Sequence, residues 1–569
     1  MVLATFELAI HLMHGKRVLT FVVVISAGLA LTTAFVPADR FFRMAKAMEQ
    51  FAEIFRVVNE AYVDELNPNT LSKKGMDEML NTLDPYTNYF SEDVVEDART
   101  GALSGYGGIG AESMRFDSRT VITRVFEGSP ADKAGIKPGD VILSLDGKRL
   151  KDITHEEAGR LVRGQAGTSV RVEVLRNGST SPETLELRRS QIQVKTVTYS
   201  GLCPPAAGPK AAQTGYIVLE QFGEGSGEEV AQAVRALRKQ GAVAIILDLR
   251  GNPGGLLTEA VEICGLFLPK GKLVVTTRGR DNESKGEFFT PDPPIEPDMP
   301  VAVLVNRTSA SASEIVAGTL QDYDRAVVIG ERTYGKGLVQ TRRPLSYNSV
   351  SMITTARYYT PSGRCIQVLD YSRRRADGSV GSVPDSVKKA FKTSRGRLVF
   401  DGGGIEPDVV LERKFKPELG DMLISKGHLI DFAARHRLKY PVLPPNGPDV
   451  NDALLAEFSE WLQGRSLVYS GTAERALADI KSAAAAEQIF DQVGPSFGRV
   501  SDDLRKARRN EVMRYPGQVR KMLAQEIARV HSLDRGAAAA GYGYDPEWQE
   551  AVKIVHNPEA YGKLLGGNR

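Results

Sequence analysis

The chain contains few histidines and few cysteines. Its 569 residues include seven histidines and three cysteines, and no histidine lies between residues 156 and 427. A serine nucleophile in that stretch would therefore need another kind of base. The cysteines, Cys203, Cys264 and Cys365, are odd in number and far apart in the sequence. They argue against a disulfide framework and a cysteine-based metal site, and we expect neither a metal nor a cofactor.

The sequence also lacks an excess of charge of either sign. Lys and Arg total 73 against 70 for Asp and Glu, so there is no basic footprint for a nucleic acid and we expect no such partner. The length predicts three or four domains.

The first forty residues differ from the rest of the chain. Lys16 and Arg17 precede an uncharged apolar segment from Val18 to Ala38, which is 21 residues long. Such a segment can span a bilayer or serve as a signal peptide, and positive residues before it favour export of the body. We expect residues 1–38 to be a signal peptide or membrane anchor, with a periplasmic or other extracytoplasmic location, and anchoring in the inner membrane if uncleaved. The choice between anchor and signal stays open.

The stretch from residue 301 to 340 reads as strand, helix and strand around a serine and a lysine. Val301 to Val305 is a short β-branched run typical of a buried strand. Ser311-x-x-Glu314 then opens a helix, and a second apolar run follows from Ala326 to Ile329. Lys336 lies between two glycines just beyond that run.

These residues fit nucleophilic catalysis with a lysine base. Burial that lowers the pKa of Lys336 would leave a neutral amine able to take the Ser311 proton. Gln340 lies four residues later and would share a face with Lys336 in an extended segment. The Ala312 N–H group at the helix start would point toward a developing oxyanion.

A structural interpretation stands beside the catalytic one. Ser311-x-x-Glu314 is also a good capping box, and most such serines only cap helices. A lysine between glycines is more often found in a surface turn. Ser309 and Ser313 stay open as alternatives to Ser311.

The segments SASASE (309–314) and GERTYGKGLVQ (330–340) resemble the carboxyl-terminal processing, or tail-specific, serine proteases. The resemblance covers roughly residues 50 to 410. It implies a Ser–Lys pair made of Ser311 and Lys336, supported by Gln340, in a crotonase-like α/β core. It also implies that the glycine-rich loop Arg250-Gly251-Asn252-Pro253-Gly254-Gly255 supplies a second oxyanion donor, at Gly255 or its neighbour Gly254.

The segment LSGYGGIG (103–110) contains Gly105-x-Gly107-x-x-Gly110, the spacing of a dinucleotide fingerprint. We reject that function because strand-like residues follow instead of a helix. The sequence from about 103 to 190 resembles a PDZ domain, which captures peptide C-termini with loop amides. The resemblance implies that Gly108, Ile109 and Gly110 bind the carboxylate, whereas the alternative is a simple turn. The preceding Leu83-Asp84-Pro85-Tyr86-Thr87 is similar to the family's lead-in to its PDZ domain.

The predicted domains follow from these features. They are the N-terminal segment, a helical segment at 39–102, the PDZ domain at 103–190, the catalytic core at 191–414 and a helical C-terminal extension at 415–569. The extension has predicted helices near 449–464, 473–493, 501–533 and 545–566, with Pro516 kinking or breaking the third, and is a candidate for homo-oligomer formation or substrate gating. Residues 371–400 form a basic insertion of uncertain order.

The sequence therefore predicts a serine endopeptidase that binds protein or peptide C-termini and cleaves through an acyl-enzyme. Two other functions remain: a catalytically inactive PDZ scaffold and an acyl-CoA enzyme of crotonase type.

Overall fold

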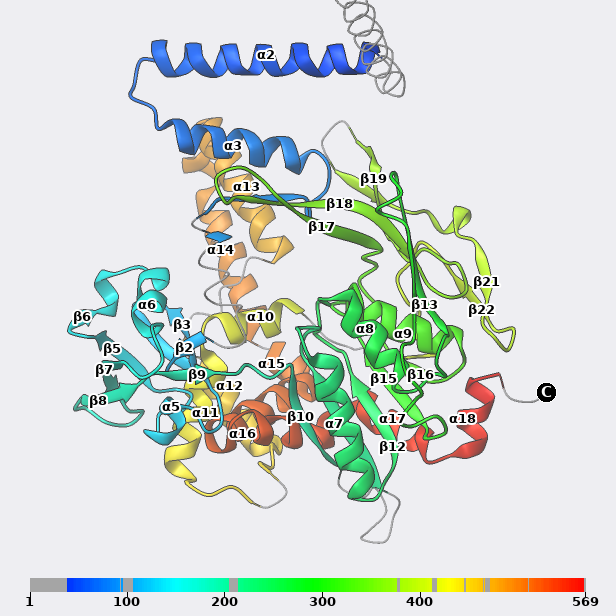
Figure 1. Ribbon diagram of the computed structural model, residues 1–569. Coiled ribbons are helices and arrows are strands. Elements are labelled where there is room, and N and C mark those ends of the chain that lie inside the picture. The colour runs from blue at the N-terminus through cyan, green and yellow to red at the C-terminus, as the bar shows by residue number, and fades with distance from the viewer. Residues whose placement is uncertain are drawn as a thin grey trace, which may run out of the picture. The chain divides into compact units, whose positions relative to one another are not determined.

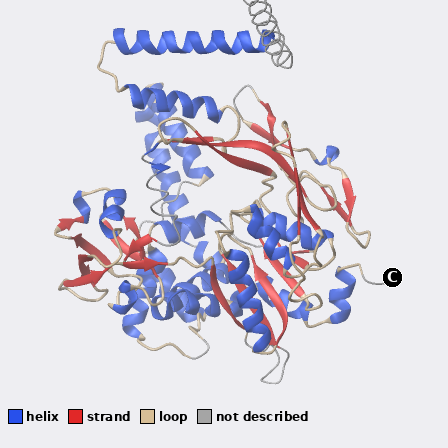
Figure 2. Cartoon of the chain, viewed as in Figure 1, coloured by secondary structure: helices blue, strands red, loops and turns tan. Residues whose placement is uncertain are grey.

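The chain has a mixed α/β fold in a computed structural model (Figure 2). The structure describes residues 38–566 except 93, 96–105, 204–212, 376–378, 412–416, 445–446, 464, 466–470 and 510. The predicted signal or anchor segment before Ala38 lies outside these residues. Contacts divide the chain into two units, of which the first ends at Thr82 and the second begins at Leu83.

In its described part, from Ala38 onward, the first unit contains two helices, α2 (Ala38–Ala61) and α3 (Pro68–Asn81). Asn67 caps α3, because its side chain accepts hydrogen bonds from the Asn69 and Thr70 N–H groups. The segment 39–102, predicted to be helical, contains these two helices and also a short strand at Asn88–Phe90.

The segment predicted to be a PDZ domain folds around an antiparallel sheet in the second unit. Its sheet has the order β3-β4-β5-β7-β8, and β6 pairs with β5. Strand β3 is therefore an edge strand of this sheet. The elements are β2 (Tyr106–Gly108), β3 (Ala111–Phe116), β4 (Arg119–Val125), α5 (Pro130–Lys133), β5 (Val141–Leu145), β6 (Lys148–Arg149), η1 (Leu150–Asp152), α6 (His155–Val162), β7 (Ser169–Leu175), β8 (Glu183–Arg188) and β9 (Ser190–Ile192).

The core is built on a six-stranded sheet with the order β10-β11-β12-β15-β16-β23. Strand β10 runs antiparallel to β11, and the other neighbours are parallel. All five residues of β15 are buried, which explains its continuous apolar run. The strands are β10 (Val197–Leu202), β11 (Gln213–Leu219), β12 (Ala242–Asp248), β15 (Val301–Val305), β16 (Val327–Gly330) and β23 (Val409–Val410).

Helices cover both faces of this sheet (Figure 1). Alternate strand residues such as Val303 pack with α7 (Ser226–Lys239), α8 (Leu257–Gly265) and α9 (Ala312–Asp322). The intervening residues, such as Leu304, pack with α17 (Pro546–Val555), and Leu564 of α18 (Pro558–Leu564) adds to that cluster. The last helices of the chain are thus a layer of the core.

A second sheet carries the segment after Lys336. Its long central strand β18 (Val350–Tyr359) pairs with β17, with β13 and with β1, and β13 pairs with β14. The other strands are β1 (Asn88–Phe90), β13 (Leu273–Gly279), β14 (Gly286–Phe289) and β17 (Leu338–Pro344). Strand β18 therefore lies between β1 and β17, the strand that follows the lysine.

The insertion of uncertain order contains two small hairpins in its described part. Strand β19 pairs with β20, and β21 pairs with β22. The elements are β19 (Leu369–Arg374), β20 (Val380–Ser382), η2 (Asp385–Val387), β21 (Ala390–Lys392) and β22 (Leu398–Phe400).

The C-terminal helices form a further apolar cluster of their own, centred on Phe432, Phe458 and Leu523. Pro516 begins a helix directly after the previous one has ended, so it breaks the predicted third helix. These elements are α10 (Pro417–Ser425), α11 (His428–Lys439), α12 (Asp452–Leu462), α13 (Thr472–Ala486), α14 (Phe490–Arg509), α15 (Glu511–Arg514), α16 (Pro516–Ala540) and η3 (Tyr542–Tyr544). Among the helices that the structure describes, none is long and apolar enough to cross a membrane.

Candidate active site

Ser311 lies on a strained turn at the start of α9. Its φ is 55° and its ψ is −114°, a combination that a non-glycine residue rarely adopts. The Ser311 carbonyl accepts hydrogen bonds from the Glu314 and Ile315 N–H groups and from the Tyr358 hydroxyl, the last at 3.1 Å. The backbone on both sides of the hydroxyl is therefore fixed, while the side chain makes no capping hydrogen bond.

The two neighbouring serines have structural partners. Ser309 is fully buried and donates to the Leu249 carbonyl at 2.7 Å. Ser313 is also fully buried and donates to the Asn252 carbonyl at 3.0 Å. These contacts favour Ser311, which is half-buried, as the nucleophile among the three candidates.

The glycine-rich loop after β12 lies directly against Ser311. A Cβ atom on Gly254 would come within 2.8 Å of the Ser311 Cβ and 2.9 Å of the Ala312 nitrogen. The Gly254 N–H group donates to the Asn252 side chain at 2.8 Å, so it is occupied. The Ala312 and Gly255 N–H groups have no acceptor among the described residues. This arrangement favours Ala312 and Gly255 as the pair of oxyanion donors.

Glu314 joins the serine turn to the lysine turn. Its fully buried carboxylate accepts hydrogen bonds through Oε2 from the Ser311 N–H at 2.8 Å and from the Lys336 N–H at 2.9 Å. Through Oε1 it accepts from the Gly335 N–H at 2.7 Å and the Thr333 hydroxyl at 2.5 Å. Burial raises the pKa of this carboxyl to about 7, and the four donors act in the opposite direction. One side chain thus holds both candidate catalytic residues by their backbones.

The Lys336 amine is half-buried and lies over the ring of Tyr86, with Nζ 4.3 Å from the ring centroid. Burial lowers its pKa, while the charges of Asp84 and Glu314 raise it. Within the described part of the chain, Nζ makes no hydrogen bond to Ser311. The geometry therefore places the amine beside Tyr86, on a turn that is fixed relative to Ser311.

Gln340 lies in β17, opposite Thr354 of β18. Its amide nitrogen donates to the Thr354 hydroxyl at 3.3 Å. Lys336 precedes β17, which begins at Leu338, and the residue left out of the pairing at Gln340 belongs to β18. The predicted shared face of Lys336 and Gln340 stays a prediction. The Gln340 amide donates to a strand neighbour, and its contact with the amine stays a prediction.

The predicted carboxylate loop of the PDZ domain has open donors. The carbonyl groups of Ile109 and Gly110 accept from Ala131 and Phe126 N–H groups, respectively. In contrast, the Ile109 and Gly110 N–H groups have no acceptor in the described ranges. The loop leads into β3, the edge strand, which leaves room for an added peptide strand.

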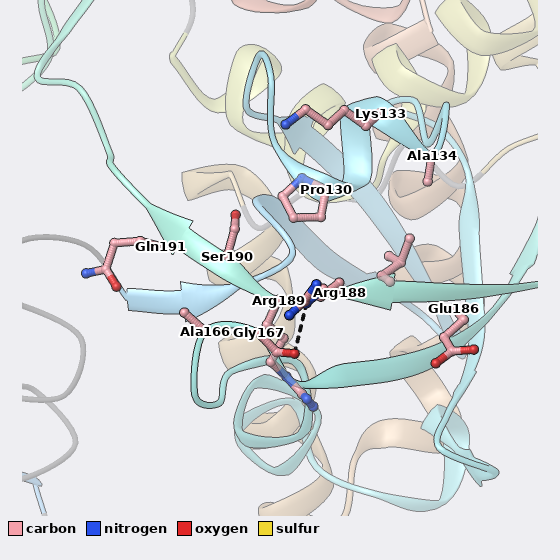
Figure 3. A pocket seen from close by; sticks show the side chains of 11 residues that line it. Pro130, Lys133, Ala134, Ala166, Gly167, Glu186, Arg188, Arg189, Ser190 and Gln191 are labelled. Atoms are coloured by element: carbon pink, nitrogen blue, oxygen red, sulfur yellow. Dashed lines mark hydrogen bonds between the residues drawn. The ribbon is translucent and has the colours of Figure 1, made fainter.

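A hollow of about 640 Å³ lies elsewhere on the PDZ domain, lined by residues of α5, β8 and β9 (Figure 3). Its lining residues Ser190 and Gln191 belong to β9, which pairs with Gly108 and Gly107 of β2. Arg189, also in the lining, donates to the carbonyl groups of Leu161 and Val162 at the end of α6. This arginine therefore joins the end of α6 to the segment between β8 and β9.

Family comparisons agree with this division. Residues 213–370 match the model of peptidase family S41, residues 121–176 match a PDZ domain, and residues 419–555 match the C-terminal helical domain of a probable PDZ-protease. A carboxy-terminal-processing protease of Bartonella bacilliformis is 35% identical over 378 residues, which cover 65% of this chain and 82% of the relative. The chain belongs to the carboxy-terminal-processing proteases of family S41.

Other relatives agree over a smaller share. A probable CtpA-like serine protease of Staphylococcus aureus is 35% identical over 323 residues, which cover 56% of this chain and 62% of that protein. Among solved structures, the photosystem II D1 C-terminal processing protease is 28% identical, with a TM-score of 0.35 over 67% of this chain and 96% of the other. The family assignment therefore rests on the sequence matches.

Sequence reasoning missed two members of this site. Glu314 was predicted only as half of a capping box, although the same motif places its carboxylate at the serine turn. Tyr86 is 250 residues from Lys336 in the sequence, and the motif around it signalled a turn and no contact with the amine.

Proposed function

We propose that this protein is a serine endopeptidase that cleaves by a Ser311–Lys336 acyl-enzyme mechanism after its PDZ domain has bound a protein C-terminus. The observation that carries the catalytic part is the Glu314 carboxylate, which accepts from the Ser311 and Lys336 N–H groups through one oxygen. Two turns that are 25 residues apart in sequence are thereby held as one unit.

The proposed reaction has an acylation stage and a deacylation stage. A neutral Lys336 amine takes the Ser311 proton while Oγ forms a bond to the peptide carbonyl carbon. The Ala312 and Gly255 N–H groups stabilise the oxyanion. The C–N bond then breaks, the lysine proton passes to the leaving amine, and an acyl-enzyme remains. Lys336 next takes a proton from water, which attacks the ester carbonyl carbon. The bond between that carbon and Ser311 Oγ then breaks, and the lysine proton passes back to Oγ, which restores the neutral amine and the serine hydroxyl.

Lys336 must turn from Tyr86 toward Ser311 for this proton transfer. A lysine has four side-chain torsions, so a change of rotamer with a fixed backbone can make the move. Gln340 has an amide oxygen that could accept from the amine in its new position. The proposal therefore needs a side-chain rearrangement only.

The PDZ domain supplies the proposed substrate recognition. The open Ile109 and Gly110 N–H groups suit a terminal carboxylate, and the edge strand β3 suits the residues that precede it. We expect a peptide with a free C-terminus to bind the Ser311→Ala protein more tightly than the same peptide with an amidated C-terminus. Fluorescence anisotropy with the two peptides measures the difference, and equal affinity would contradict this part.

The catalytic part is tested by labelling with a fluorophosphonate and by peptide hydrolysis. We expect Lys336→Ala to lose both while it keeps the wild-type melting temperature. Lys239→Ala is the matched control, because Lys239 lies exposed at the end of α7, and it should keep both activities. A fully active Lys336→Ala protein would overturn the mechanism, and an unreactive wild-type Ser311 would favour an inactive scaffold.

The parallel sheet between two helix layers supports the proposed crotonase-like core. The rival acyl-CoA function predicts nucleotide affinity, and calorimetry with coenzyme A distinguishes it. The apolar segment after Lys16 and Arg17 supports export, which cell fractionation tests.

A further inference from the structure

Tyr86 belongs to the sequence Asp84-Pro85-Tyr86-Thr87, whose role is not explained by the protease mechanism. It precedes the PDZ domain, whereas Lys336 lies in the core beyond it. The fold nevertheless places the Lys336 amine over the Tyr86 ring, at 4.3 Å from its centroid. A residue from outside the family match at 213–370 thus contacts the proposed base.

Hydrogen bonds fix the position of the Tyr86 backbone. The buried Asp84 carboxylate accepts from the Tyr86 N–H at 2.9 Å, from the Thr87 N–H at 2.8 Å and from the Thr87 hydroxyl at 3.1 Å. These are the contacts of an Asx turn, which is rigid because one carboxylate holds several donors. Tyr86 therefore enters the site on a preorganised turn.

The same turn is attached to the strand beside Gln340. The Thr354 N–H donates to the Thr87 hydroxyl at 3.2 Å, and the Thr354 hydroxyl accepts from Gln340 at 3.3 Å. The next residues, Asn88 to Phe90, pair with β18. One continuous network therefore joins Asp84, Thr87, Thr354 and Gln340.

Two other tyrosines complete the surroundings of Tyr86. Its hydroxyl donates to the hydroxyl of Tyr334 at 3.3 Å, and Tyr334 is two residues before Lys336. The ring of Tyr371 meets it edge-on, with centroids 6.2 Å apart. Burial raises the pKa of Tyr86 far above its usual value, so the ring stays neutral.

We propose that Tyr86 is a positioning residue for the base, because its ring covers the Lys336 amine and keeps water from it. The inference rests on the proposed Ser311–Lys336 mechanism. The ring has two opposed effects on the amine. Exclusion of water favours the neutral amine, while the face of the ring attracts the ammonium ion.

Burial is the first cause of the lowered Lys336 pKa, and the Tyr86 ring, 4.3 Å from Nζ, is one of the groups that cover the amine. The charged groups that act on the amine are Glu314 from α9 and Asp84 from the turn. The Tyr86 ring faces the amine, and Tyr334 and Tyr371 contact Tyr86. Both carboxylates favour the charged amine. The covering ring opposes them.

The test compares Tyr86→Leu with Tyr86→Phe, which keeps the ring and removes only the hydroxyl. Lysines are labelled by reductive methylation with [¹³C]formaldehyde in a Ser311→Ala background, and the Lys336 signal is identified by its loss in Lys336→Arg. We expect the Lys336 pKa to rise by about one unit in the Leu variant and to stay unchanged in the Phe variant.

Kinetics give the second readout. The acid limb of kcat/KM should move upward by about one pH unit in Tyr86→Leu, with a loss of about tenfold on that limb, and Tyr86→Phe should restore the wild-type profile. A Lys336 pKa that is unchanged or lowered in the Leu variant would overturn the inference. Tyr86→Met replaces the Leu variant if melting shows that the latter is unfolded.

Lys336→Ala, measured in parallel, separates this inference from the mechanism. If Lys336→Ala is inactive while Tyr86→Leu titrates and cleaves as wild type, only the role of Tyr86 fails. If Lys336→Ala is active, the proposed mechanism fails first.

Discussion

Replacement of Glu314 by glutamine tests whether one buried carboxylate holds the two catalytic turns. Glutamine has nearly the same shape but only one acceptor oxygen. If the amide nitrogen takes the place of Oε2, the Ser311 and Lys336 N–H groups lose their acceptor. If it takes the place of Oε1, the Gly335 N–H and the Thr333 hydroxyl lose theirs. In either orientation two donors lose their acceptor and face the NH2 group of the glutamine, which is itself a donor.

The magnitude follows from these contacts. A buried polar group without a partner costs about 1–3 kcal/mol, so two cost about 2–6 kcal/mol of folding free energy. The turns can reduce this cost by moving apart, but a displacement of about 1 Å at a reacting group can lower the rate about 100-fold. We therefore expect Glu314→Gln to lose stability in urea unfolding and about 100-fold in kcat, with a smaller change in KM.

Glu259→Gln is a matched control. Glu259 is a buried carboxylate in α8 that accepts from the Gly225 and Gly227 N–H groups and from the Ser226 hydroxyl at the start of α7. Its replacement should cost comparable stability and leave kcat within a few-fold of wild type. Equal losses of kcat in both variants, or a wild-type kcat in Glu314→Gln, would refute the positioning role.

The pH dependence of stability gives an independent check. The Glu314 pKa is about 7 in the folded chain, above its usual 4.5, so the folded state binds this proton more tightly. The contribution is complete below pH 4.5 and is lost as pH rises through 7, by on the order of 3 kcal/mol. Between pH 4.5 and 8 the free energy of unfolding should therefore fall by about 3 kcal/mol more in wild type than in Glu314→Gln.

Three further predictions concern the surrounding groups. Ser311→Ala should lose activity by about 10³-fold or more, whereas Ser313→Ala should keep it and lose about 1 kcal/mol of stability in urea unfolding. Gly255→Ala should lower kcat about 100-fold or more, because its Cβ would come within 2.2 Å of the Phe222 carbonyl oxygen and displace the loop; wild-type kcat would show that this loop conformation is not required. Asp545→Asn should cost about 3 kcal/mol in calorimetry, since Asp545 pairs with the buried Arg250, and an unchanged melting temperature would contradict this.

The elements of the core could be predicted because their signals are local. The β-branched run at Val301–Val305 became β15, and the capping motif before Ile315 became the start of α9. Ser311 could be selected because the absence of histidine pointed to a lysine base and the family motif named both residues. The choice between Gly254 and Gly255 needed the structure, since only the hydrogen bond to Asn252 distinguishes their N–H groups.

Contacts between distant segments could not be predicted from periodicity. A capping motif indicates that Glu314 binds the start of its own helix, but gives no sign that it also binds the Lys336 turn. The prediction that Lys336 and Gln340 share a face assumed one continuous strand, whereas β17 begins at Leu338, after the lysine. Tyr86 reaches the amine only because β1 pairs with β18.

The C-terminal helices show the same limit and explain why the catalytic core is incomplete without them. Trp548 and Val552 of α17 pack on Ile246 and Leu304 of the central sheet, so this face of the sheet is apolar and needs a cover. The sequence pattern of α17 predicts an apolar face but not its partner.

The same helix also supplies charged partners for Arg250. Its buried guanidinium pairs with Asp248 of β12 and, at the start of α17, with Asp545 and Glu547. Arg250 begins the loop that carries Gly255, and an unpaired buried charge there would be costly. The last layer of the chain therefore supports the oxyanion loop from the face of the sheet opposite α9.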